Sequence, residues 1–262
     1  MAMTRRAGRT FSETAFEMFC ESAGLVLSRI PEGTKKTPDY LLTLGRREIV
    51  VEIKQTEKNK EEEESDRVLA ATGVGLVTGG TPGAKVRAMI AAASPQIKAR
   101  TEGRRPSLLV LFDRGMVAGY CDPYHVRVGM YGLEQLVVAL PLDRSERPVA
   151  RGWKHGPKRK MTPDSNTSIS AIGVLFVTGP DQPFRLAVYH NDFAAVPLKP
   201  DVLGGVPGIT QYRCSDPEAG QRTEWAEMAR PKRAGRALAW WIVCGVIVML
   251  AGLLAARFLA SG

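Results

Sequence analysis

Three polar side chains near the start of the chain have the residue types and the spacing of a hydrolytic site. Asp39 follows a proline, and Glu52 and Lys54 lie two residues apart inside the apolar segment 48–55. Side chains of a β-strand alternate between its two faces, so Glu52 and Lys54 project from the same face, with apolar side chains packed behind them. The pattern therefore predicts a strand that presents an acid and a base at one point.

The turn before this strand decides whether Asp39 joins the pair. Segments 39–44 and 48–55 have the pattern of a β-hairpin around Gly45-Arg46. If those two residues form the turn, Asp39 lies opposite Glu52, and such partners have Cβ atoms roughly 4.5–5.5 Å apart. A divalent cation would compensate the repulsion, and two oxygen ligands favour Mg²⁺, with Mn²⁺ as the alternative, over zinc. A three-residue turn would instead place the two acids on opposite faces.

A lysine beside two metal-binding carboxylates has a use in phosphodiester hydrolysis. The ammonium of Lys54 could orient and acidify an attacking water, or stabilise the charge that develops on a phosphate, while the metal polarises the phosphoryl oxygen. The alternative is a structural hairpin in which Glu52 and Lys54 form a surface ion pair and bind no metal. The two interpretations predict opposite responses to a titration with Mn²⁺.

The elements that would position these residues follow from local patterns. Thr10 and Glu13 have capping-box spacing, which predicts a helix to about Ala23. The apolar run 107–112 predicts a central strand that is covered on both faces. Further elements are expected as a short strand over 25–30, a loop or frayed helix over 56–67, helical segments over 84–93 and from Ser94-Pro95 to Arg100, and strands over 168–177 and 184–190.

At this point the chain resembles a known family. Pro38-Asp39 followed by Glu52-Ile53-Lys54 is similar to the motif of the PD-(D/E)XK nuclease superfamily. The resemblance covers residues 10–113, which have the order helix, three-stranded meander, helix and strand of a restriction-endonuclease-like fold. It implies that Asp39 and Glu52 bind the metal and that Lys54 is catalytic.

The resemblance also implies roles for residues outside the central motif. Family members often carry a further acid on the first helix, which matches Glu17 best, with Glu13 as the competitor. Gln55, directly after the lysine, matches a polar position of the catalytic site, and Gln96, on the second helix, matches one expected to face nucleic acid. No motif after residue 113 matches the family.

Charge patterning adds candidate partners. The chain carries a net charge of +9 with a pI near 9.6, which favours phosphate-rich partners or an anionic membrane surface. The basic stretch 151–160 could follow a nucleic-acid backbone, with Trp153 stacking on a base; a solvated loop is the alternative. Its candidate nucleic-acid-binding residues are Lys154, Lys158, Arg159 and Lys160. The four cysteines and three histidines are scattered, which argues against a zinc site or a disulfide framework.

The C-terminal segment is different in character. Residues 237–256 carry no charge and have the length needed to cross a membrane, and basic residues gather before them. This predicts a transmembrane anchor over 237–257, joined by a charged linker (216–236) to a domain (10–215) in the cytoplasm. A buried core helix is the alternative. The spacing of Gly252 and Ala256 favours helix pairing and hence a homodimer.

Together these patterns predict an α/β chain with a restriction-endonuclease-like core, a late strand pair and one C-terminal transmembrane helix. The expected function is Mg²⁺-dependent cleavage of DNA, or of RNA, at the cytoplasmic face of a membrane. A different class of function stays open: a nuclease-like module that has lost cleavage and binds nucleic acid or signals at the membrane.

Overall fold

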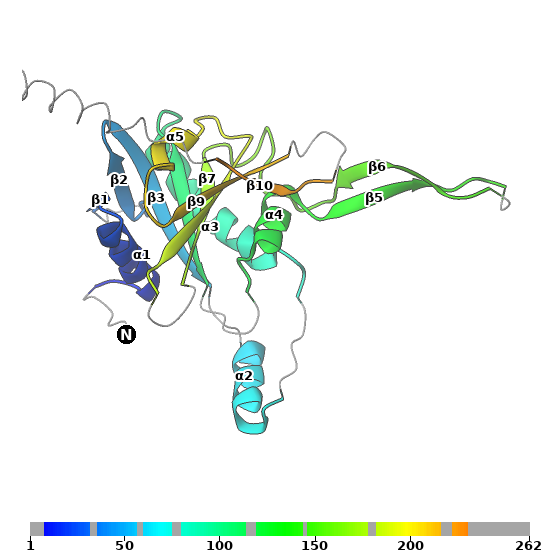
Figure 1. Ribbon diagram of the computed structural model, residues 1–262, viewed down its shortest axis with the longest axis horizontal. Coiled ribbons are helices and arrows are strands. Elements are labelled where there is room, and N and C mark those ends of the chain that lie inside the picture. The colour runs from blue at the N-terminus through cyan, green and yellow to red at the C-terminus, as the bar shows by residue number, and fades with distance from the viewer. Residues whose placement is uncertain are drawn as a thin grey trace, which may run out of the picture. The chain divides into compact units, whose positions relative to one another are not determined.

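The computed structural model describes residues 8–31, 36–56, 60–74, 80–113, 119–143, 146–177, 182–215 and 222–229. The helices among them are α1 (Phe11–Ser22), α2 (Lys60–Thr72), α3 (Ala84–Thr101), α4 (Pro123–Tyr131) and α5 (Pro200–Leu203). The strands are β1 (Val26–Arg29), β2 (Tyr40–Leu44), β3 (Arg47–Thr56), β4 (Ser107–Asp113), β5 (Glu134–Ala139), β6 (Val149–His155), β7 (Ala171–Phe176), β8 (Arg185–His190), β9 (Ile209–Cys214) and β10 (Trp225–Glu227). Figure 1 shows their arrangement, and the chain is a mixed α/β protein.

The described strands form one large mixed sheet and one separate hairpin. The sheet has eight strands in the order β1-β2-β3-β4-β7-β8-β9-β10, and β5 pairs with β6. Its first three strands are an antiparallel meander, β4 lies parallel to both β3 and β7, and the remaining pairs include both orientations. The strand that carries Glu52 and Lys54 is therefore an interior strand.

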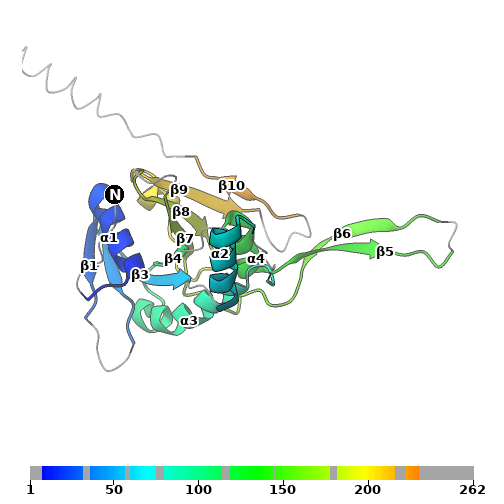
Figure 2. The same cartoon turned by 90° about the horizontal axis from the view of Figure 1, so that it is seen from below.

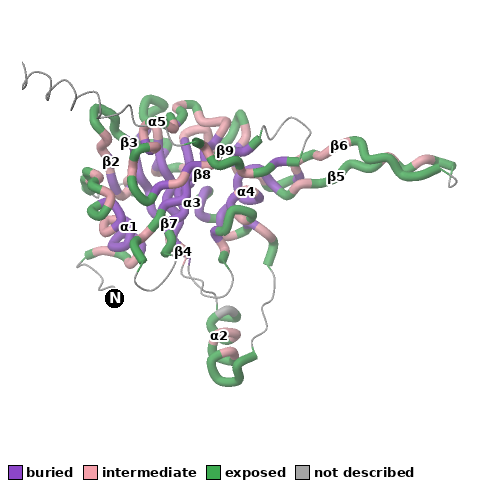
Figure 3. Tube along the Cα trace, in the orientation of Figure 1, coloured by how far each residue is buried: buried purple, intermediate pink, exposed green. Residues whose placement is uncertain are grey.

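Helices cover both faces of the sheet around β3 and β4 (Figure 2). Leu108 and Val110 of β4 pack with α1 in one hydrophobic cluster, whereas the intervening Leu109 and Leu111 pack with α3 and α4 in a second. Figure 3 shows that burial concentrates in these central strands. The expectation that 107–112 forms a strand buried on both faces is confirmed.

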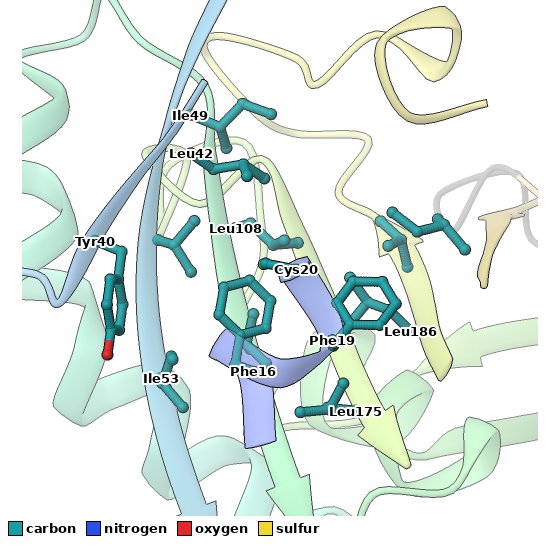
Figure 4. Packing of buried hydrophobic residues seen from close by; sticks show 14 of the residues in the cluster. Phe16, Phe19, Cys20, Tyr40, Leu42, Ile49, Ile53, Leu108, Leu175 and Leu186 are labelled. Atoms are coloured by element: carbon teal, nitrogen blue, oxygen red, sulfur yellow. The ribbon is translucent and has the colours of Figure 1, made fainter. Parts of the chain in front are cut away.

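The α1 face provides the apolar support for the candidate site. Its capping box is present, because Thr10 Oγ1 accepts from the Glu13 amide and the Glu13 carboxylate accepts from the Thr10 amide. Phe16 and Phe19 then project from α1 onto the sheet (Figure 4). Ile53 belongs to the same cluster, so the residue between Glu52 and Lys54 lies in the core, as alternation predicts.

The β2–β3 hairpin has the two-residue turn on which the site depends. Leu44 pairs with Arg47 and Tyr40 pairs with Val51, which leaves Gly45 and Arg46 as the turn. Gly45 has φ +61°, and no positive φ occurs at Arg46. Glycine at the first central position is the pattern of a type II′ turn, whose twist matches that of the flanking strands. Extending this register by one step places Asp39 opposite Glu52.

Helix α3 differs from the sequence prediction. It continues through Ser94-Pro95, where a new helical start was expected. Proline in a helix interior removes a hydrogen bond and costs about 3 kcal/mol. Here Pro95 is exposed, while Ala93 and Ile97 beside it are fully buried. The burial of an uninterrupted apolar stripe outweighs the local preference for a break.

The second half of the chain contains several elements that the sequence patterns did not predict, namely α4, β5, β6, α5, β9 and β10. Strand β6 includes the first half of the basic stretch 151–160, and β10 lies inside the segment expected to be a linker. The segment expected to cross a membrane (237–257) lies outside the described residues. Within the described ranges, none of the helices is long and apolar enough to span a membrane.

Candidate functional site

Glu52 is a buried acid that forms an ion pair with Lys54. The Nζ atom of Lys54 lies 2.5 Å from Glu52 Oε1, and the Lys54 side chain is 26% exposed while that of Glu52 is 2% exposed. The strand thus places the carboxylate inside the fold and the ammonium at its boundary with solvent. The pair is half-buried, not the surface ion pair of the structural alternative.

Asp39 reaches the same point from the beginning of β2. Its Oδ2 accepts a hydrogen bond of 2.7 Å from the amide of Ile53. The charge of Asp39 in turn acts on Glu52, where it is one cause of the raised pKa of that carboxyl. The two acids are therefore brought together by the chain's own backbone, in the arrangement that the two-residue turn predicts.

Burial raises the pKa of both carboxyls. Desolvation is the largest cause for Glu52, followed by the charge of Asp39, and together they raise its pKa from 4.5 to about 7 against the opposing effect of Lys54. Desolvation also raises the pKa of Asp39, partly offset by the hydrogen bond from Ile53. A cation bound beside both carboxyls would favour their ionised forms, because its positive charge would offset the repulsion between them.

Gln96 connects α3 to this pair. With its side-chain amide oriented so that the nitrogen faces the acid, Gln96 donates to Glu52 Oε1 at 2.6 Å and to Oε2 at 2.9 Å. A residue expected to face nucleic acid thus holds the buried carboxylate in place.

The donor set fits a hard divalent cation. Asp39 and Glu52 contribute carboxylate oxygens, which Mg²⁺ and Mn²⁺ prefer. Across the described residues, no three His, Cys, Asp or Glu side chains gather closely enough to hold a metal between them. A cation bound by the two acids would take further ligands from water and substrate phosphate, as Mg²⁺ commonly does in phosphoryl-transfer sites.

The two candidate acids of α1, Glu13 and Glu17, have different partners. The carboxylate of Glu17 accepts hydrogen bonds from Arg9 Nε at 2.8 Å and from the Tyr40 hydroxyl at 2.7 Å. Tyr40 packs with Phe16 on the α1 face of the sheet, opposite the face that carries α3. Glu13, in contrast, is one of the charges that raise the pKa of Asp39. Of the two candidates, Glu13 therefore has the stronger electrostatic link to Asp39.

The structure places the remaining predicted site residues elsewhere. Gln55 follows Lys54 and therefore points to the α1 face, where its buried Oε1 has no hydrogen-bond partner among the described residues.

The four cations expected to bind nucleic acid lie in another part of the fold. Lys154 lies exposed in β6, opposite Gln135, and Lys158 is exposed with φ +68°. Arg159 and Lys160 follow at half-buried positions, and the Lys160 amide donates to the Met130 carbonyl. All four cations belong to the β5–β6 hairpin and the loop after it.

One polar pair near the site was missed by sequence reasoning. Thr56 Oγ1 donates to Asp113 Oδ1 at 2.7 Å, across the adjacent ends of β3 and β4. Asp113 Oδ2 also accepts from the amides of Tyr120 and Cys121, so this carboxylate orders the chain before α4. Alternation puts Thr56 on the face of Glu52 and Lys54. The sequence signal that could have identified Asp113 is its position directly after the apolar run 107–112.

The site thus consists of a buried acid and a lysine at the solvent boundary, both on the interior strand β3, and a second acid that lies directly before β2 and accepts from a β3 amide. Comparison of the chain with protein-family models, with curated proteins and with solved structures found no match.

Proposed function

We propose that this protein is a metal-dependent nuclease of the PD-(D/E)XK type that hydrolyses phosphodiester bonds of DNA. The observation that carries the proposal is the convergence of Asp39, Glu52 and Lys54, with the Lys54 ammonium 2.5 Å from Glu52 and the Asp39 carboxylate bonded to the neighbouring amide. The element order α1-β1-β2-β3 followed by α3 and β4 supports a restriction-endonuclease-like core.

Each residue of the cluster has a separate task in this account. Asp39 and Glu52 would hold Mg²⁺, which would supply Lewis-acid polarisation of a phosphoryl oxygen. Lys54 has three N–H donors at the solvent boundary, where its ammonium would contact a phosphate oxygen or orient the attacking water. Gln96 keeps the Glu52 carboxylate oriented by donating to both of its oxygens.

The proposal extends to partners and location. The net charge of +9 favours a polyanionic substrate. The apolar segment 237–256, preceded by basic residues, would tether the nuclease to the cytoplasmic face of a membrane. Pairing of that segment would make the protein a homodimer.

The proposal is tested with the full-length chain, purified in detergent and incubated with duplex DNA, single-stranded DNA and RNA. Cleavage of DNA is expected with Mg²⁺ and not with EDTA, and Asp39→Ala is expected to remove it. The control is Glu227→Gln, which alters an exposed acid on β10 at the far edge of the sheet and is expected to leave cleavage unchanged.

The outcomes distinguish the candidate functions. DNA binding without turnover would support the module that has lost cleavage. Cleavage of RNA alone would reassign the substrate while keeping the site. Full DNA cleavage by Asp39→Ala would refute the site itself.

A further inference from the structure

A cavity of about 580 Å³ lies at the other end of β3 from the acids. It is lined by the β2–β3 turn, by residues 104–106 before β4, and by the segment 196–199 before α5. Its volume is within the roughly 300–1,000 Å³ of typical small-molecule sites. The proposed nuclease mechanism makes no use of it.

The lining of the cavity is strongly cationic. Five basic side chains and one acid contribute to it, the basic ones being Arg46, Arg47, Arg104, Arg105 and Lys199. Arg105 pairs with the lining acid, Glu48, at 3.4 Å, and Arg47 pairs with Asp201 outside the cavity at 3.6 Å. In the described part of the chain, Arg46, Arg104 and Lys199 have no ion-pair partner. Gathered cations without counter-charges favour an anionic ligand with several charged oxygens.

The same cavity also has an apolar wall. Ile49 and Leu198 are buried, and Val196 and Val202 beside them are half-buried. An extended DNA duplex would contact the exposed cations and leave this wall unused. A ligand that joins phosphates to a flat apolar group would use both, because its phosphates would contact the arginines while its ring lies against the aliphatic side chains.

We propose that this cavity binds a nucleoside polyphosphate, with the phosphates on Arg46, Arg104 and Lys199 and the base against Val196 and Val202. The site is separate from the nuclease centre. Glu52 lies three to five residues along β3 from the residues that line the cavity, which is roughly 10–17 Å at about 3.3 Å per residue. The two sites can therefore be tested independently.

The test is calorimetric titration of the full-length chain in detergent with ATP, GTP and inorganic triphosphate, in EDTA so that no metal occupies the acidic pair. A nucleoside triphosphate is expected to bind. Arg46→Glu/Arg104→Glu is expected to weaken it about tenfold or more, because each lost bond to phosphate is charge-assisted. Val196→Trp, which fills the cavity and keeps every charge, is expected to weaken it as well.

Two controls isolate the effect. Lys60→Glu/Arg185→Glu reverses two exposed cations on α2 and β8 and is expected to bind as tightly as the unaltered chain. Asp39→Asn is also expected to bind normally, whether or not the chain is a nuclease. Far-UV circular dichroism of each variant checks that the fold is kept.

Each contrary result is decisive. The proposal is overturned if no nucleoside triphosphate binds at millimolar concentration, or if the Arg46/Arg104 double variant binds normally. It is equally overturned if inorganic triphosphate binds as tightly as ATP and GTP, because the apolar wall would then contribute nothing. If the double variant binds nucleoside triphosphate normally but loses affinity for duplex DNA in a parallel titration, the proposal is overturned and the cavity is part of a nucleic-acid surface.

Discussion

The Ile53 amide donates a 2.7 Å hydrogen bond to Oδ2 of Asp39, and this contact ties the start of β2 to the strand that carries Glu52 and Lys54. Because the contact uses the backbone of β3, the position of Asp39 depends on the hairpin register rather than on a particular neighbouring side chain. The register in turn depends on the turn at Gly45-Arg46. The testable consequences concern the protonation of Glu52, metal binding, the roles of Glu13 and Glu17 on α1, the turn, and the role of Lys54.

Protonation of Glu52 makes stability depend on pH. Its pKa is raised from 4.5 in the unfolded chain to about 7 in the fold. Between these values the folded state holds a proton that the unfolded state has released, so the free energy of unfolding falls as pH rises, by roughly 1–3 kcal/mol. The side chain introduced by Glu52→Gln cannot titrate, so the free energy of unfolding of this variant is expected to change less with pH. Urea denaturation at pH 5 and pH 8 measures the difference, and equal slopes for both proteins would contradict the assignment.

Metal binding is expected to require both acids. Asp39→Asn and Glu52→Gln should each weaken Mn²⁺ binding about tenfold or more, since each removes a charged ligand. The affinity of the unaltered chain should rise between pH 6 and pH 8, because binding displaces the Glu52 proton. Calorimetry in two buffers of different ionisation enthalpy measures both the Mn²⁺ affinity and the release of the proton. Mn²⁺ binding that is unchanged in either variant would show that the carboxyl pair is only structural.

Matched substitutions distinguish the roles of Glu13 and Glu17 on α1. Glu13 acts on the pKa of Asp39, whereas Glu17 is bonded to Arg9 and Tyr40. We expect Glu13→Gln to lower the apparent pKa of the pH–rate profile for cleavage, because a negative charge near Asp39 is removed. Glu17→Gln should reduce stability by about 1–3 kcal/mol through its lost bonds and leave that profile in place. If Glu17→Gln shifts the pH–rate profile and Glu13→Gln does not, Glu17 is the acid that acts on the site.

The turn can be tested at Gly45. Its φ of +61° disfavours any residue with a Cβ, although an added Cβ would meet no atom within 4 Å. Gly45→Ala is therefore expected to cost about 1–2 kcal/mol of stability through backbone strain alone. Gly205→Ala, at a position that also has open space and no positive φ, is the control. Equal effects of the two substitutions would exclude a role for the left-handed conformation.

The hairpin and α1 were predictable because their signals are local. Strand alternation, the glycine turn and the capping box act over a few residues, and each is present in the structure. These signals were sufficient to predict which face of β3 carries Glu52 and Lys54. With Gly45-Arg46 as a two-residue turn, as the structure has it, the same signals also predict Asp39 opposite Glu52.

Other features depend on tertiary packing and had no local signal. Helix α3 continues through Pro95 because the apolar residues on either side are buried against the sheet. Glu13 and Glu17 lie one helical turn apart, so only their partners in the fold distinguish them. Gln96 reaches Glu52 from another element. The short strands and helices after residue 113 have weak periodicity, and long-range pairing decides their conformation.

The most direct test of the proposed nuclease site is a comparison of cleavage and binding in Lys54→Met, which keeps the aliphatic stem and removes the ammonium. The predicted result is Mn²⁺ and DNA binding close to that of the unaltered chain, with DNA cleavage slower by about 10²–10³-fold, as for loss of one stabilising donor. Cleavage by Lys54→Met at the rate of the unaltered chain would contradict the account.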